Sequence, residues 1–364
     1  MIIAFRGVTA RPTPRRVHST AVRKISRWLS LLAAASSSTS AASSAPRLRA
    51  CFTAAGVGGD GPNLRPLSSE AGGGRSYGDL PSLAKRLAEG SFRDVVIVAG
   101  AGLSVAAGVP DFRSPKTGLY HQLERYNLPY PEAIFDLNFF HGNPAPFATF
   151  AREIWPGQTG EGGPRPTLGH AFLRLLQSRG ALRRVYTQNI DGLERMAGLS
   201  ESSLVECHGH FSSASCVGCR EEMVAEECRE AYVGGKKAPL CRRCGSLVKP
   251  DIVFFGEELP KRFVRFVDAD LAECDLLIVL GTSLMVNPVA SLPSCVGGDV
   301  PRLLINRELV GDFAYASTHA SSSQDVSRDN FFEGDCDDGV RYLCELAGKD
   351  WVEDLKRIHD EVTS

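Results

Sequence analysis

The 364-residue sequence lacks three features that would have pointed to particular classes of protein. No apolar stretch approaches the roughly 20 residues that a bilayer-spanning helix needs. We therefore expect no membrane span. There is also no internal repeat, and residues 1–59 contain no Asp or Glu at all. The overall composition, with 43% hydrophobic and 23% charged residues, is ordinary for a soluble enzyme.

The acid-free leader contains nine Lys or Arg and is rich in Ser and Ala, a composition typical of organelle transit peptides. Val22, Ile25 and Leu29 recur at helical spacing. A disordered basic tail is the alternative, but the absence of acid favours targeting. We predict a mitochondrial transit segment over residues 1–59 leading to the matrix, followed by a flexible linker over 60–77.

The charge of the remaining chain is very different. From residue 60 onward there are 32 basic and 42 acidic residues, a formal net charge of −10. Phosphate binding needs a basic surface, so nucleic acid is not expected as the main partner.

Apolar runs separated by helical stretches predict the fold. Val95–Val98, Val185–Thr187, Leu276–Leu280 and Leu303–Ile305 read as strands that end near Gly, Ser, Thr or Asn. This pattern predicts an α/β class with a Rossmann-like parallel sheet, whose ligands bind beyond the carboxyl ends of the strands. We place the catalytic domain at residues 78–351, with a helical insertion at about 114–170, a cysteine module at about 207–250 and a tail over 352–364.

The strongest metal signal is a pair of C-x-x-C knuckles, Cys216 with Cys219 and Cys241 with Cys244. Two such turns can complete a tetrahedron of thiolates around zinc. Disulfides or a redox pair are the alternatives, but the joint occurrence of the two knuckles favours zinc. Four thiolates leave no open position, so the zinc is expected to be structural, with Cys228 as a bystander.

The loop after the first strand starts like a dinucleotide fingerprint and then departs from it. Gly100-Ala101-Gly102 occupies the first two glycine positions, but Val105 stands where a third small residue is required. The chain continues with Val109-Pro110-Asp111-Phe112-Arg113, which an ordinary cofactor loop does not need.

Three further motifs carry polar or aromatic groups. Gln188, Asn189 and Asp191 follow a strand and suit ribose hydroxyls and a carboxamide, although Asp191 and Glu194 could instead cap a helix. His208 could be a general base, a structural histidine or a metal ligand. KPDIVFFGE, residues 249–257, reads either as a core strand or as an aromatic wall for a long side chain.

Taken together and in this order, GAGLS, VPDFR, TQNIDG, His208-Gly209, the two knuckles, KPDIVFFGE, GTSL and LLINRE closely resemble the sirtuins, the NAD-dependent protein-lysine deacylases. The resemblance covers about Tyr77 to Trp351. DFRSPKTGLY and VPRLLINRELVG look most like class I, and the leader points to its mitochondrial members.

The resemblance implies an NAD-dependent deacetylase that releases nicotinamide and O-acetyl-ADP-ribose from acetylated lysines of proteins, here mitochondrial enzymes. It assigns chemistry to His208, Asn189 and Asp191. The implied NAD contacts are Gly100, Ala101, Gly102, Ser104, Asp111, Phe112, Arg113, Gln188, Asn189, Ile190, Asp191, Gly281, Thr282, Ser283, Asn306, Arg307, Asp335 and Cys336. The implied substrate contacts are Phe139, Val253, Phe254, Gly256, Glu257, Met285 and Val286.

Two alternatives remain beside deacetylation: mono-ADP-ribosyl transfer and removal of another acyl group. Relatives that remove acidic acyl groups hold the distal carboxylate with a Tyr and an Arg after the cofactor loop. Here Tyr120 is followed by no Arg until Arg125, which predicts a preference for neutral acyl groups. Cys207, His210, Met285 and Asn287 depart from the usual family pattern and leave peptide preference open.

Overall fold

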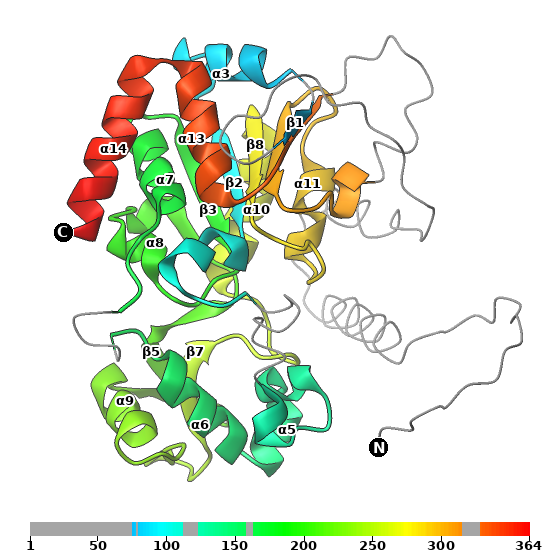
Figure 1. Ribbon diagram of the computed structural model, residues 1–364. Coiled ribbons are helices and arrows are strands. Elements are labelled where there is room, and N and C mark those ends of the chain that lie inside the picture. Colours follow the sequence, from blue (N-terminus) through cyan, green and yellow to red (C-terminus); the bar gives the residue numbers. More distant parts are fainter. Residues whose placement is uncertain (1–74, 78, 112–122, 158–162, 315–327) are drawn as a thin grey trace, which may run out of the picture. The chain divides into compact units, whose positions relative to one another are not determined.

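Two apolar runs, β2 (Val95–Ala99) and β8 (Leu276–Leu280), lie side by side in the central sheet of the computed structural model (Figure 1). Every residue of both strands is buried, as expected of parallel strands covered by helices on both faces. The structure describes residues 75–77, 79–111, 123–157, 163–314 and 328–364. All of them belong to one unit, Ala45–Ser364.

Within the described residues the central sheet has seven strands, in the order β1-β10-β9-β8-β2-β3-β4. Only β1 is antiparallel to its neighbour, and the other six strands are parallel. The Rossmann-like α/β prediction is therefore confirmed. The remaining strands are β1 (Arg75–Tyr77), β3 (Leu182–Thr187), β4 (Leu204–Glu206), β9 (Arg302–Asn306) and β10 (Asp329–Glu333).

Helices cover both faces of this sheet. Alternate side chains of β2 point to opposite sides: Val95 and Ile97 join one core, whereas Val96 and Val98 join another. The first face packs against α3 (Leu80–Ala88), α7 (Leu168–Ser178), α13 (Cys336–Ala347) and α14 (Lys349–Thr363) (Figure 1). The second face packs against α10 (Lys261–Glu273) and α11 (Leu292–Cys295).

A separate hydrophobic core unites the inserted segment with the cysteine segment. It joins α5 (Leu137–Gly142), α6 (Ala145–Ile154) and α9 (Ala225–Val233) to a small sheet ordered β6-β5-β7. The strands of that sheet are β5 (Gly209–Cys216), β6 (Glu222–Met223) and β7 (Val248–Ile252). Phe147 of α6 makes ring contacts with Tyr232 of α9 and with Phe254. The two expected modules are thus one packing unit.

The predicted boundaries need correction at both ends of the domain. The last residues of the expected linker form β1, which pairs with β10 at the sheet edge. Most of the expected tail, 352–364, belongs to α14, whose Trp351, Leu355 and Ile358 are buried in the first core. Most of residues 352–364 thus form a packed helix and not a tail, because Leu355 and Ile358 recur at helical spacing and are buried in the core. Among the described residues, no helix has the length and apolar character needed to cross a membrane.

Candidate active site

The order of the strands reverses between β2 and β8. After β2 the chain adds β3 and β4 on one side, and later adds β8, β9 and β10 on the other. Ligands of open parallel sheets bind at the carboxyl ends of the strands on either side of such a reversal. The glycine-containing loops after β2 and β8 therefore lie where a nucleotide is expected.

Glycine is required where these two loops touch. A Cβ atom on Gly102 would lie 2.6 Å from the Cα of Gly281, and a Cβ atom on Gly281 would lie 2.6 Å from the Cα of Gly102. Gly281 also has a positive φ of 57°. Because the obstructing atoms are backbone, neither loop can accept a side chain without moving the other.

Polar side chains of two segments meet beyond β2. Asn189 donates from Nδ2 to the carbonyl of Gly100 at 3.1 Å and to Ser104 Oγ at 3.3 Å. Ser104, which is buried, donates to Asp191 Oδ2 at 2.7 Å. The structure therefore brings the predicted amide, hydroxyl and carboxylate into one hydrogen-bonded set.

The other predicted cofactor residues are spread along the same edge of the sheet. Gln188 Nε2 donates to Thr282 Oγ1 at 2.8 Å, joining the loops after β3 and β8. Arg307 after β9 forms an ion pair of 2.5 Å with Asp335, which precedes α13 and the buried Cys336. Ala101 lies in the short 3-10 helix Ala101–Leu103, and Ile190 packs on the aromatic core. Phe112 and Arg113 lie outside the described residues.

His208 lies between the two sheets, because β4 of the large sheet ends at Glu206 and β5 of the small sheet begins at Gly209. Its Nδ1 atom is 2.9 Å from the carbonyl oxygen of Gln188. A carbonyl can only accept, so neutral His208 carries its proton on Nδ1 and keeps a lone pair on Nε2. Burial lowers the pKa of His208, opposed by the hydrogen bond to Gln188, so the imidazole is neutral at pH 7 and suited to act as a base.

The segment after β7 forms the wall beside His208. Val253 N–H donates to the carbonyl of His208 at 2.8 Å. Phe254 is buried, and its ring contacts those of Phe135, Phe140 and Phe147, whereas Phe139 on α5 is partly exposed. The sequence predicted a strand that ends in Phe254–Gly256. The observed strand, β7, ends at Ile252, so Phe254–Gly256 lie beyond it.

Glu257 holds this segment in place. Its Oε2 atom accepts from the Phe254 N–H at 2.8 Å and lies 2.7 Å from Lys249 Nζ, in a pair that is almost completely buried. By contrast, Phe255 and Met285 expose 45% and 61% of their surface. The predicted substrate-contact residues thus include both a buried turn, at Phe254 and Glu257, and one exposed apolar side chain, Met285, whereas the exposed Phe255 was not among them.

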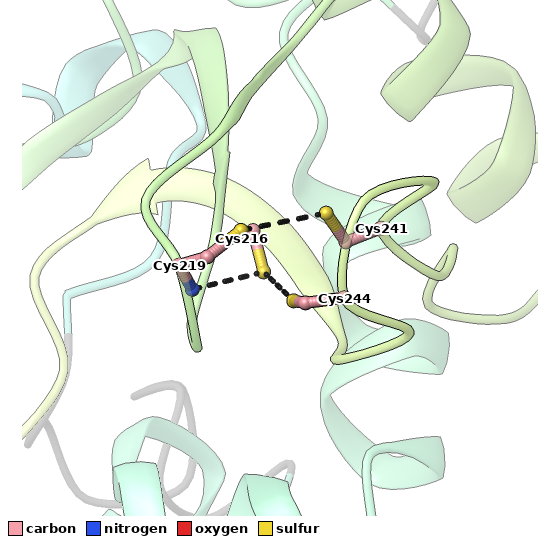
Figure 2. A group of neighbouring side chains, drawn as sticks. All are labelled: Cys216, Cys219, Cys241 and Cys244. Carbon is pink, nitrogen blue, oxygen red and sulfur yellow. Dashed lines mark hydrogen bonds between the residues drawn. The ribbon is translucent and has the colours of Figure 1, made fainter.

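The four predicted zinc ligands converge at the end of β5 (Figure 2). Their sulfur atoms all lie within 4.8 Å of one another, with Cys216–Cys244 at 3.4 Å and Cys219–Cys241 at 3.6 Å. A zinc tetrahedron with Zn–S bonds of about 2.3 Å needs S–S distances of about 3.8 Å. The cluster is therefore close to the geometry that a structural zinc ion needs. Cys228 is buried on α9, outside the cluster.

Comparison with known proteins decides the family. Residues 100–288 match the Sir2 family. The chain belongs to the Sir2 family. It is 46% identical to the zebrafish NAD-dependent protein deacetylase sirtuin-2 over 78% of this chain and 76% of that protein. It is 44% identical to the mouse NAD-dependent protein deacetylase sirtuin-3 over 84% and 90%, respectively. For the fission yeast NAD-dependent protein deacetylase hst2 the identity is 44% over 77% and 79%.

The sequence of this Sir2 family member gave no sign of the buried ionisable groups that pack beneath the loop 188–191, which follows β3. The suggested capping box does not form: Gly192 is the N-cap of α8 (Leu193–Met196), and Asp191 Oδ1 accepts from the Leu193 N–H at 2.9 Å. Glu194 is instead buried and accepts from Thr187 Oγ1 at 2.5 Å. Desolvation, together with the charge of Asp191, raises the pKa of Glu194 to about 8.

Proposed function

We propose that this chain is an NAD-dependent protein-lysine deacetylase that transfers the acetyl group to ADP-ribose, giving free lysine, nicotinamide and O-acetyl-ADP-ribose. One observation carries the proposal: the Nδ1–H of His208 is held by the carbonyl of Gln188, beside the Asn189, Ser104 and Asp191 set. Membership of the Sir2 family and the printed names of the relatives support it.

The groups at the carboxyl edge of the sheet fit NAD. Backbone atoms of Gly100 and Gly281 leave no room for side chains, and the nearby amides, hydroxyls and carboxylates suit ribose and a carboxamide. The proposed contact set includes all NAD residues predicted above. NAD, when bound, supplies a ribose carbon that becomes electrophilic as nicotinamide leaves.

The chain's own residues have distinct tasks in this proposal. Asn189 and Asp191 orient the sugar, and His208 accepts a proton from a sugar hydroxyl at Nε2 while Nδ1–H stays on Gln188. The acyl-lysine lies along Val253, Phe254 and Phe139, which exclude water. Gly256-Glu257 and Met285-Val286 pair with the substrate backbone as flanking strands.

The test is deacetylation of an acetylated peptide by residues 75–364 with NAD labelled in its adenosine part. Label in O-acetyl-ADP-ribose supports the proposal, whereas label retained on protein supports ADP-ribosyl transfer. His208→Ala should abolish turnover and leave NAD binding nearly intact, because the base acts after binding. His359→Ala on α14 is the matched control. Acetyl loss at the same rate without NAD would refute the proposal.

We further propose that residues 1–59 direct the chain to the mitochondrial matrix, where acetylated enzymes are its substrates. The acid-free, basic composition of this segment supports the proposal. Residues 1–59 fused to a fluorescent protein should enter mitochondria, and a fusion in which the nine basic residues are replaced by Gln should not. A wild-type fusion that stays in the cytosol would contradict it.

A further inference from the structure

Three ionisable side chains meet in the interior beside the loop 188–191 that follows β3. His170 comes from α7, Asp191 from the loop after β3, and Glu194 from α8. One ring nitrogen and one oxygen from each carboxyl group lie within 4.8 Å of one another. His170 has no exposed surface and Glu194 only 2%. Of the three, only Asp191 has a task in the proposed reaction.

The hydrogen bonds of His170 decide which nitrogen carries its proton. Its Nδ1 accepts from the Thr167 N–H at 3.1 Å, while the Thr167 hydroxyl donates to the carbonyl of Leu103. Neutral His170 therefore carries its proton on Nε2, a buried atom with no hydrogen-bond partner in the described part of the chain. Burial lowers the pKa of His170 to about 3, so the ring stays neutral.

This tautomer argues against a metal ion in the cluster. A metal ligand needs a free lone pair on nitrogen, but Nδ1 of His170 uses its lone pair to accept from the Thr167 N–H, and Nε2 bears the proton. The cluster is thus suited to holding protons, because it gathers a neutral imidazole and two carboxyl groups in the interior.

The two carboxyl groups differ in how well they are solvated by the protein. Asp191 accepts from the Ser104 hydroxyl and from the Leu193 N–H. Glu194 accepts from the Thr187 hydroxyl and from its own backbone N–H, but it is more deeply buried than Asp191. Two neighbouring buried carboxyl groups do not ionise together, and the charge stays on the better solvated one. In the described part of the chain, Glu206, Cys207 and Arg195 are the other ionisable groups around Glu194.

We infer that Glu194 is a positioning residue that stays protonated inside the fold and thereby keeps the single negative charge of the cluster on Asp191. This inference rests on the proposed deacetylase function. With one charge, Asp191 holds the Ser104 hydroxyl, whose oxygen accepts from Asn189. A second charge on Glu194 would repel Asp191 and disturb this set, so turnover should fall at alkaline pH.

The decisive experiment is the pH profile of kcat/KM for NAD. The wild type should lose activity above a pH of about 8, by about tenfold per pH unit. Glu194→Gln is neutral at every pH and can still accept from Thr187, so it should keep the wild-type rate at neutral pH without the alkaline loss. Glu201 is an exposed glutamate that follows α8 in the chain. Its substitution, Glu201→Gln, should reproduce the wild-type profile.

Two results would overturn the inference. One is a Glu194→Gln profile with the wild-type alkaline loss. The other is an inactive Glu194→Gln protein that melts like the wild type, which would mean that an ionised Glu194 is needed.

Thermal unfolding separates this inference from the proposed function, because it needs no activity. The pKa of Glu194 is raised on folding, so the native protein holds a proton that the unfolded chain has lost between the two pKa values. Wild-type stability should therefore fall, relative to Glu194→Gln, as pH rises from about 4.5 to about 8. A difference in Tm that does not change with pH would refute the inference even if the chain were no deacetylase.

Discussion

Gly209→Ala should lower the stability of the protein and its kcat more than substitution of another glycine with a positive φ, because backbone atoms of β7 lie against Gly209. The residue follows His208, begins β5 and has a positive φ of 77°. A Cβ atom there would lie 1.9 Å from the carbonyl oxygen of Asp251 and 2.9 Å from the Cα of Ile252. Both are backbone atoms of β7, so relief requires the two strands to separate.

Gly180→Ala provides the matched control for the conformational part of the cost. Gly180 also has a positive φ, 67°, but a Cβ atom there would meet no atom of the described residues within 4 Å. Its substitution should cost only the left-handed strain, about 1–2 kcal/mol. Gly209→Ala carries the same strain plus overpacking of about 1–3 kcal/mol. The difference between the two variants thus measures the contact with β7.

Urea unfolding and deacetylation kinetics together test this reasoning. Gly180→Ala should unfold earlier than the wild type and keep its kcat. Gly209→Ala should be less stable than Gly180→Ala, and it should lose kcat because the His208 carbonyl is hydrogen-bonded to Val253 beside the displaced strand. Equal stability of the two variants, or a normal kcat for Gly209→Ala, would show that β5 and β7 can part without moving His208.

Three further outcomes are expected. Burial lowers the pKa of His208, so the acid limb of the kcat/KM profile should lie below the ordinary histidine value of about 6.5. An acid limb above that value would contradict the assignment of His208 as a neutral base. Cys241→Ser should reduce both zinc content and Tm, as measured by metal analysis and calorimetry, whereas Cys228→Ser should keep the zinc. Acetyl peptides should exceed succinyl peptides in kcat/KM by at least about a hundredfold, because Arg125 pairs with Glu153 and leaves the succinyl carboxylate without a compensating charge. Equal rates would mean that a cation reaches the acyl group.

The parallel sheet could be predicted because its strongest signals are local. Leu276–Leu280 is an uninterrupted apolar run and forms β8 with the same bounds, while Val95–Val98 lengthens by one residue to give β2. Strands β4 and β10 were not predicted. β4 has three residues, and β10 (DNFFE) places two aromatic residues between polar ones, so neither shows an apolar run.

The second core could not be predicted from the sequence, because it depends on contacts between distant segments. Phe147 and Phe254 are more than a hundred residues apart, yet their ring centroids are 4.8 Å apart. The zinc tetrad was easier, since the spacing of each knuckle alone implies two ligands on one turn. The role of Glu194 was the hardest to predict, because exposed and buried glutamates look alike in a sequence. Its burial and its hydrogen bond with Thr187 arise only when α8 folds back beside the end of β3.

The position of His208 explains why a structural metal belongs in this enzyme. His208 sits on the two-residue link between β4 of the large sheet and β5 of the small sheet. β5 runs from Gly209 to Cys216, so one end of the strand adjoins the proposed base and the other end supplies a zinc ligand. β7, which pairs with β5 and leads to Val253, starts just beyond Cys244. Both strands that fix the backbone of His208 are therefore anchored at the metal cluster. Removal of zinc should loosen the base as well as the module, although the metal itself has no open position for chemistry.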